Sequence, residues 1–272
     1  MDCSGSSFTS EFVEARQQFH QETYMRLNAK FNPEIFIRFN QLANFAIKQV
    51  YEPVIASGER QSVRIPCPDM GGFCMGLGIM MVMFGGNFEE FVKAIATPRG
   101  FIHVQQIQKG YMALFFAQTS KINDVNFLNW INSSRCLSKL LNKDFSVRDT
   151  KSISLADRII CEDQEFECKE NGGCCFHVVL QGENFSHAFI AIWAINGVAV
   201  FDPNVGYLAF ENASIRVDIN SGEYYKIPLL NDLLFEFMKL YKEKYQGGRG
   251  QDIFHSTPIY SNNPVLISKP VV

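Results

Sequence analysis

The first half of the chain carries apolar side chains at helical spacing. Apolar residues recur along 12–27 behind a polar start at residue 10, which predicts a first helix. Asn32 followed by Pro33 is typical of a helix start, and the residues behind it keep i, i+3, i+4 and i+7 spacing, so we expect a second helix over 35–46. Further helices are predicted from Cys74 to the glycines at 85–86, from the Asn87 cap with Glu90, over 101–119 and over 124–141.

The pattern changes in the second half of the chain to short apolar runs bounded by turn residues. These runs predict strands over 175–181, 187–195, 198–201, 206–211 and 213–218. Asn196-Gly197 between two of them is a strong signal for a tight hairpin. Asn231 is the expected cap of a last amphipathic helix, and the chain shows no periodicity from residue 249 onward.

Helices followed by an antiparallel sheet, with no linker between them, predict one α+β domain. We divide the chain into a helical N-terminal extension over 1–60, a main domain over 61–248 and an irregular C-terminal tail over 249–272.

The composition of the chain indicates a globular protein and argues against several functional classes. Hydrophobic residues make up 47% of the chain and 25 residues are Phe, so a substantial core can form. The net charge of −3 argues against a nucleic-acid binder, which needs a basic surface. Apolar stretches fall short of the roughly 20 residues that a membrane span needs, and the N-terminus lacks the features of a secretory signal.

Eight cysteines in 272 residues are too few for a disulfide scaffold, so we expect reduced thiols, as in the cytosol. Several of them lie near His177 in the sequence, but they lack the paired C-x-x-C spacing of a zinc site. We therefore expect neither a metal nor another cofactor.

Cys74 is the candidate nucleophile. It stands in the run Gly-Gly-Phe-Cys-Met-Gly-Leu, where the glycines predict a turn into a helix that carries Cys74 in its first turn. The unpaired N–H groups and positive dipole end of a helix N-terminus favour a thiolate. Considered alone, a cysteine in an apolar run is more often a buried and inert small side chain.

A cysteine nucleophile needs a base, and the base needs a group that orients it. Among the five histidines, His20 and His103 lie on predicted helices and His255 lies in the tail, so His177 and His187 are the serious candidates. His187 opens an apolar strand, where a side chain can reach the edge of a cleft.

Asp202 is the candidate orienting group, because it stands at the exit of the strand that follows the His187 strand. A hairpin centred on Asn196-Gly197 places positions that sum to about 393 opposite each other. Position 206 would then face His187, and the turn at Pro203 would return Asp202 to its side. Asp-Pro-Asn is also an ordinary turn sequence, so a purely structural Asp202 stays an alternative.

Three blocks in this order resemble the YopT-like family of bacterial effector cysteine proteases: Gly-Gly-Phe-Cys-Met-Gly-Leu, Ser-His-Ala-Phe-Ile-Ala-Ile and Phe-Asp-Pro-Asn-Val-Gly. The similarity covers about residues 65–210. It implies a papain-like fold in the 61–248 domain, with Cys74 as nucleophile at the start of a central helix, His187 as base and later acid, and Asp202 as orienting group.

Papain-like enzymes usually place an amide side chain a few residues before the nucleophile, where it donates a hydrogen bond to the oxyanion. This chain has Cys67, Pro68 and Asp69 there. A protonated Asp69, or backbone N–H groups including that of Cys74, are then the candidate donors.

Three functions remain open. The first is a protease that cleaves a host protein through a thioester, injected by a bacterium and acting in the host cytoplasm. The second is a glutamine deamidase or transglutaminase-like toxin with the same triad. The third is a non-catalytic binding module, which predicts a buried and unreactive Cys74. The oligomeric state is not determined by the sequence.

Overall fold

The structure is a computed structural model that describes residues 10–39, 41, 73–117, 145–147, 151–154, 168, 172–181, 186–211, 226–246, 253–261 and 265–267. Its helices are α1 (Ser10–Phe31), α3 (Cys74–Met83), α4 (Phe88–Ile95), α5 (Pro98–Ala117) and α9 (Lys226–Gln246). Its strands are β1 (Ile35–Arg38), β2 (Phe145–Val147), β3 (Lys151–Ser154), β4 (Cys174–Gln181), β5 (Ser186–Ala194), β6 (Gly197–Asp202), β7 (Gly206–Glu211) and β8 (Ile253–Ser261).

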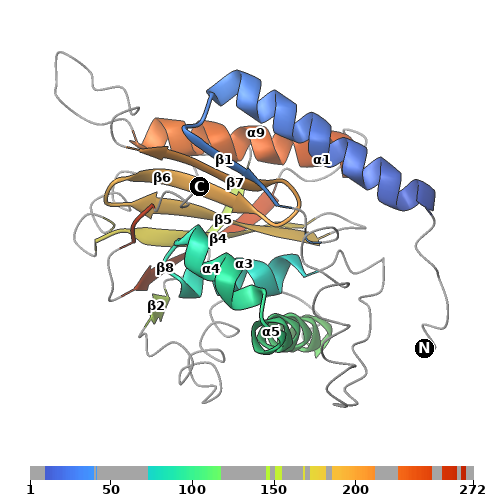
Figure 1. The fold of residues 1–272 in the computed structure, drawn as a ribbon, viewed down its shortest axis with the longest axis vertical. Coiled ribbons are helices and arrows are strands. Elements are labelled where there is room, and N and C mark those ends of the chain that lie inside the picture. The colour runs from blue at the N-terminus through green and yellow to red at the C-terminus, as the bar shows by residue number, and fades with distance from the viewer. Residues whose placement is uncertain are drawn as a thin grey trace.

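The described strands form one antiparallel sheet in the order β1-β7-β6-β5-β4-β8-β2, and β3 also pairs with β8. Helices α1 and α9 cover one face of this sheet, whereas α3, α4 and α5 lie on the other (Figure 1). Two apolar cores result, one on each face. The α+β class that the sequence predicted is confirmed.

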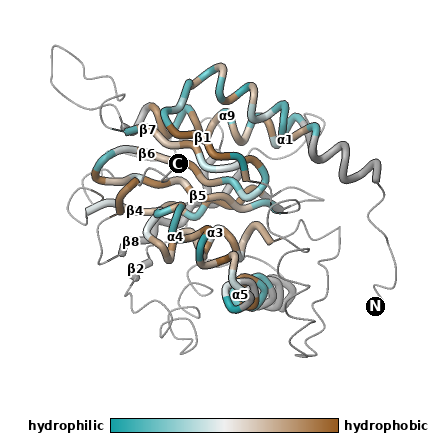
Figure 2. Tube along the Cα trace, in the orientation of Figure 1, coloured by the Kyte–Doolittle hydropathy of each residue, from teal (hydrophilic) through white to brown (hydrophobic). Residues whose placement is uncertain are grey.

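Burial on both faces explains why the central strands are almost continuously hydrophobic (Figure 2). Side chains of β5 alternate between the two cores. Ile190 and Ile192 belong to the core under α3, while Phe189 and Trp193 belong to the core under α9. The sheet is therefore a layer between two helical layers, and its register decides which side chains reach α3.

The predicted strands at 175–181, 187–195, 198–201 and 206–211 and the hairpin at Asn196-Gly197 are confirmed. The hairpin register pairs Ile190 with Phe201, so opposed positions sum to 391 instead of about 393. The helix from Asn87 is also confirmed, with the Asn87 side chain accepting from the Glu90 N–H at 3.1 Å. The helix predicted over 101–119 corresponds to α5. The predictions for 124–141 and 213–218 lie outside the described residues.

The helix predicted over 35–46 is wrong for residues 35–38, which form β1 and pair with β7 at the sheet edge, while residues 42–46 lie outside the described residues. Asn32 ends α1 instead of starting a new helix. Its φ of 46° is the left-handed conformation of a helix C-terminal residue, and its N–H donates to the Asn28 carbonyl. Ile35-Phe36-Ile37 suits a strand, and pairing with a distant strand outweighed the helical spacing.

The prediction of an irregular tail over 249–272 is also wrong for residues 253–261. These form β8, which lies between β4 and β2 in the sheet. Val265 continues the connection, since its N–H donates to the Gly172 carbonyl and its carbonyl accepts from Ile195. Strands on both sides of the main domain thus belong to one sheet, while the domain boundaries at 60 and 248 stay predictions.

Helix α9 begins at Lys226, before the Asn231 that was expected to cap it. Pro228 lies in its first turn, where backbone N–H groups have no acceptor within the helix. The absence of an N–H in proline therefore costs this helix no hydrogen bond. No helix in the described ranges is long and apolar enough to span a membrane.

The expectation of reduced thiols is wrong for Cys168 and Cys174, which form a disulfide. Gly172 and Gly173 both have positive φ, and the Gly173 N–H donates to the Cys168 carbonyl, so the chain turns tightly enough to bring the two sulfurs together. Cys74 and Cys175 are the cysteines outside this disulfide in the part of the chain that is described, and both are buried.

Candidate active site

Cys74 is the first residue of α3, as the sequence predicted. Its side chain is 5% exposed. The helix ends at the predicted glycines, which have φ of +60° and +79°. At its start no side chain of the preceding residue caps it, and the Gln108 side chain of α5 accepts the Gly76 N–H at 2.9 Å. The thiol therefore lies at the positive end of a helix dipole.

Helices α3 and α5 approach closely at Gly76. A Cβ built there would fall inside contact distance of the Val104 backbone carbonyl oxygen. The glycine that follows the nucleophile by two positions is thus required by packing, and it lets α5 support the first turn of α3.

His187 and Asp202 come from neighbouring strands. His187 lies near the start of β5 and Asp202 ends β6. The His187 Nε2 and an Asp202 carboxylate oxygen are 2.9 Å apart, and both side chains are buried. Opposed positions sum to 391, so extending this register past the last pair of β5 and β6 would place position 204 opposite His187. Asp202 stands directly before the turn at 203–205, next to that position.

Cys74 completes the cluster. Cys74 is near enough to the His187 side chain and to the Ala188 backbone for both to lower the pKa of its thiol. Because Asp202 holds Nε2 of the ring, a proton exchanged with the thiol passes through Nδ1, which also lies 3.4 Å from the Asn204 amide nitrogen. The structure thus brings together the three residues that the sequence singled out, from α3, β5 and β6.

The electrostatics of this cluster favour an ion pair. Burial by itself would raise the pKa of the Cys74 thiol, but the hydrogen bond and charge of His187, with the Ala188 N–H, outweigh burial and the Asp202 charge and lower it. Burial would lower the pKa of His187, but Asp202 and Cys74 raise it to about 9. Burial would raise the pKa of Asp202, but His187, with further hydrogen-bond donors, lowers it. These shifts favour a thiolate beside an imidazolium over the neutral pair.

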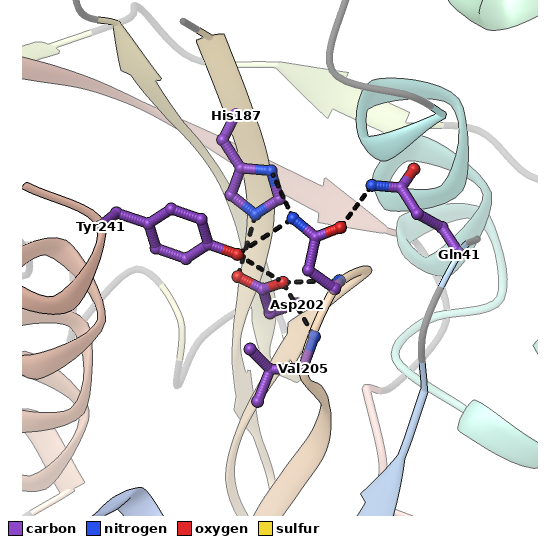
Figure 3. Close-up of polar contacts among 6 residues, drawn as sticks. Gln41, His187, Asp202, Val205 and Tyr241 are labelled. Carbon is purple, nitrogen blue, oxygen red and sulfur yellow. Dashed lines mark hydrogen bonds and ion pairs between the residues drawn. The ribbon is translucent and has the colours of Figure 1, made fainter. Parts of the chain in front are cut away.

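The second carboxylate oxygen of Asp202 is fully engaged (Figure 3). It accepts from the N–H of Asn204 at 2.7 Å, the N–H of Val205 at 3.2 Å and the hydroxyl of Tyr241 at 3.1 Å. The turn after β6 therefore serves as the Asp-Pro-Asn turn that the sequence suggested and also fixes the carboxylate that holds His187. The structural and the functional interpretations of Asp202 are compatible.

Three residues of this site were missed by sequence reasoning. Tyr241 of α9 stacks on the His187 ring with centroids 4.4 Å apart. The Asn204 amide nitrogen lies 3.1 Å from the Tyr241 hydroxyl and 3.4 Å from His187 Nδ1. Gln41 donates to Asn204 at 2.6 Å. The position of Asn204 inside the Phe-Asp-Pro-Asn block could have indicated that it belongs to the site. Tyr241 fitted the apolar face of a predicted helix, and nothing in the sequence around Gln41 indicated a role in the site.

The other sequence candidates lie elsewhere. His177 is buried in β4 beside the position of Gly78 on α3, and His103 is buried on α5. His255 lies in β8. Asp69, the candidate oxyanion donor, lies outside the described residues. Within the described ranges, no group of three or more His, Cys, Asp or Glu side chains is placed to hold a metal ion.

The first turn of α3 offers backbone donors for an oxyanion. A helix supplies no acceptor for its first N–H groups, here those of Cys74 and Met75, whereas the Gly76 N–H is taken by Gln108. These two N–H groups lie next to the thiol, where negative charge would develop on a carbonyl under attack.

Comparison with known proteins finds no matching family model and no matching curated protein. Among solved structures, the crystal structure of the Pseudomonas avirulence protein AvrPphB aligns with 70% of this chain and 92% of that chain, at 13% identity and a TM-score of 0.42. A likeness this distant carries no argument about function, which we infer from the geometry above.

Proposed function

We propose that this chain is a papain-like cysteine protease, similar to the YopT-like family, that a bacterium delivers into a host cell to cleave a host protein. One observation carries the proposal: the His187 imidazole is held at 2.9 Å by the buried Asp202 carboxylate, beside a buried thiol at the start of α3 whose pKa it lowers. The three sequence blocks that resemble the family support it.

In this mechanism the Cys74 thiolate attacks a peptide carbonyl carbon and forms a carbon–sulfur bond. The N–H groups of Cys74 and Met75 stabilise the oxyanion. When the carbon–nitrogen bond breaks, the leaving amine takes the proton from His187 Nδ1. His187 then takes a proton from water, the resulting hydroxide attacks the thioester, and the Cys74 thiolate leaves.

Burial of Cys74 does not distinguish an enzyme from a binding module, because both proposals accommodate it. The lowered pKa of Cys74 favours the enzyme, since an inert core cysteine in apolar surroundings has a raised pKa. Rapid and selective alkylation of Cys74 by iodoacetamide at neutral pH would count against the binding module.

The decisive experiment is intact mass spectrometry of host-cell lysate proteins after incubation with wild type, Cys74→Ala and Cys175→Ala. Cys175 is the matched control because it is also a buried cysteine outside the disulfide, but it lies on β4 opposite Ile192, five positions along the strand from the residue that faces His187. We expect new fragments with wild type and Cys175→Ala and none with Cys74→Ala. A one-unit gain in the mass of an intact protein would replace the protease with the deamidase. No difference among the three samples, with an unreactive Cys74, would leave the binding module.

A further inference from the structure

We propose that Gln41 is a positioning residue that holds the helix of Cys74 in register with the base His187, through a hydrogen-bond bridge to Asn204. The proposal rests on the function proposed above and adds to it a residue from a part of the chain that showed no family resemblance. The role of Gln41 is exerted through Phe73 and Asn204.

Gln41 lies between the residue before the nucleophile and the turn after Asp202, and it forms hydrogen bonds to both. Its side chain is buried, with 1% of the residue exposed. Its Oε1 accepts the Phe73 N–H at 2.5 Å, directly before the nucleophile, and its Nε2 donates to the Asn204 Oδ1 at 2.6 Å. Its own N–H donates to the Pro203 carbonyl at 2.8 Å. One side chain thus joins the start of α3 to the turn that follows Asp202. Figure 3 shows the bond from Gln41 toward that turn.

The hydrogen bonds run in one direction from the helix to the carboxylate. The Phe73 N–H donates to Gln41, Gln41 donates to Asn204, Asn204 donates to the Tyr241 hydroxyl, and that hydroxyl donates to Asp202. A backbone N–H can only donate and an ionised carboxylate can only accept, so the orientation of every amide between them is determined. Gln41 therefore fixes which way the Asn204 amide faces.

The site needs such a bridge because Cys74 and His187 belong to different layers. Helix α3 packs on the sheet through apolar side chains, and apolar contacts have no preferred direction along the helix axis. Hydrogen bonds are directional and become stronger when they are buried. A displacement of about 1 Å between nucleophile and base is enough to cost a large part of the rate.

The test measures the rate of Cys74 alkylation by iodoacetamide as a function of pH, in wild type, Gln41→Met and Gln41→Glu. Methionine keeps the length of the side chain and removes both hydrogen bonds. Glutamate, when ionised, keeps an acceptor for the Phe73 N–H and loses the donor to Asn204. Asn196→Ala is the matched control, because Asn196 also bridges two backbone groups, both of Ile267, at the far tip of the β5–β6 hairpin.

We expect alkylation at neutral pH to slow by about tenfold in Gln41→Glu, which loses one buried hydrogen bond, and by more in Gln41→Met, which loses both. The pH midpoint of the reaction should rise toward the value of about 8.5 for a free thiol. Asn196→Ala should lower the melting temperature without moving the midpoint. A change in melting temperature alone is what a merely structural glutamine would give.

Each outcome decides between the proposals. If Cys74 reacts in wild type and its midpoint does not move in Gln41→Glu, the positioning role is refuted and the triad stands. If Cys74 is unreactive in wild type, both proposals fall. Should Gln41→Met not fold, Gln41→Glu still provides the measurement, since it conserves the shape of the side chain and the contact to Phe73.

Discussion

Replacing Asp202 by Asn tests the electrostatic basis of the site. The substitution keeps the shape of the side chain and removes the negative charge that faces His187 at 2.9 Å. The remaining amide has an N–H group as well as a carbonyl, so it also ceases to favour the tautomer in which Nε2 carries the proton. We expect the thiolate–imidazolium pair to be lost.

The size of the effect follows from the pKa of His187. In the wild type burial pulls this pKa down, and Asp202 with Cys74 raises it to about 9. Without the carboxylate the largest cause that opposes burial is gone, so we expect the pKa to fall toward the ordinary value of 6.5. The difference corresponds to roughly 3 kcal/mol, or about 300-fold in the ratio of imidazolium to imidazole. At pH 7 the ring thus changes from almost fully charged to mostly neutral, and the pKa of Cys74 rises because its cationic partner is gone.

The assay is the rate of Cys74 alkylation, followed by peptide mass spectrometry over roughly pH 5 to 10, where thiols and imidazoles titrate. Wild type should react below the ordinary titration range of a thiol, and Asp202→Asn should react only as the pH rises above about 8.5. Asp232→Asn is the control, because it makes the same change at an exposed position of α9. An Asp202→Asn variant that is folded by circular dichroism and keeps the wild-type midpoint would refute the reasoning.

Three stability measurements probe the surroundings of the site. Tyr241→Phe should destabilise the protein by about 1–2 kcal/mol in urea denaturation, because it removes two buried hydrogen bonds, one to Asp202 and one from Asn204. Tyr207→Phe should be neutral or stabilising, since the Tyr207 hydroxyl is buried without a partner among the described residues. Equal losses for both would contradict the assignment. Gly76→Ala should lower the free energy of unfolding by about 1–3 kcal/mol, because the added methyl group would overpack against a backbone carbonyl of α5. Gly78→Ala should lower it by less, because its methyl group would meet a β5 side chain at 3.3 Å. The reverse order would show that the α3–α5 contact is misplaced. Glu236→Gln should lower stability at neutral pH and have little effect at acid pH. Burial raises the pKa of Glu236, but two basic residues of α1 outweigh burial and lower the pKa below 4.5. The stabilisation by this ion pair is therefore present above pH 4.5 and is lost as the pH falls through the lowered pKa. A destabilisation that does not change with pH would exclude this ion pair as its cause.

The residues of the candidate triad could be recognised because their chemistry depends on short segments. A turn of glycines into an apolar helix, a histidine at the head of an apolar strand and an Asp-Pro-Asn turn are each legible within about ten residues. The hairpin at Asn196-Gly197 then joins two of the segments, so even their proximity follows from local rules. The predicted sum of opposed positions, about 393, differed from the observed 391 because the centre of the hairpin was estimated from the turn residues. The exact centre is known only from the observed strand pairing.

The rest of the site was decided by the tertiary structure. Residues 35–38 have a helical pattern that lost to pairing with β7, and residues 253–261 have no pattern but fill a place beside β4. Gln41 and Asn204 are 163 residues apart, and Tyr241 comes from a helix whose periodicity explains it fully as a core residue. A sequence pattern reports which face of an element is apolar, whereas hydrogen bonds between distant elements depend on how the layers stack. For this protein the sequence alone determined the chemical groups, and the stacking of α3 and α9 on opposite faces of one sheet determined how those groups are held.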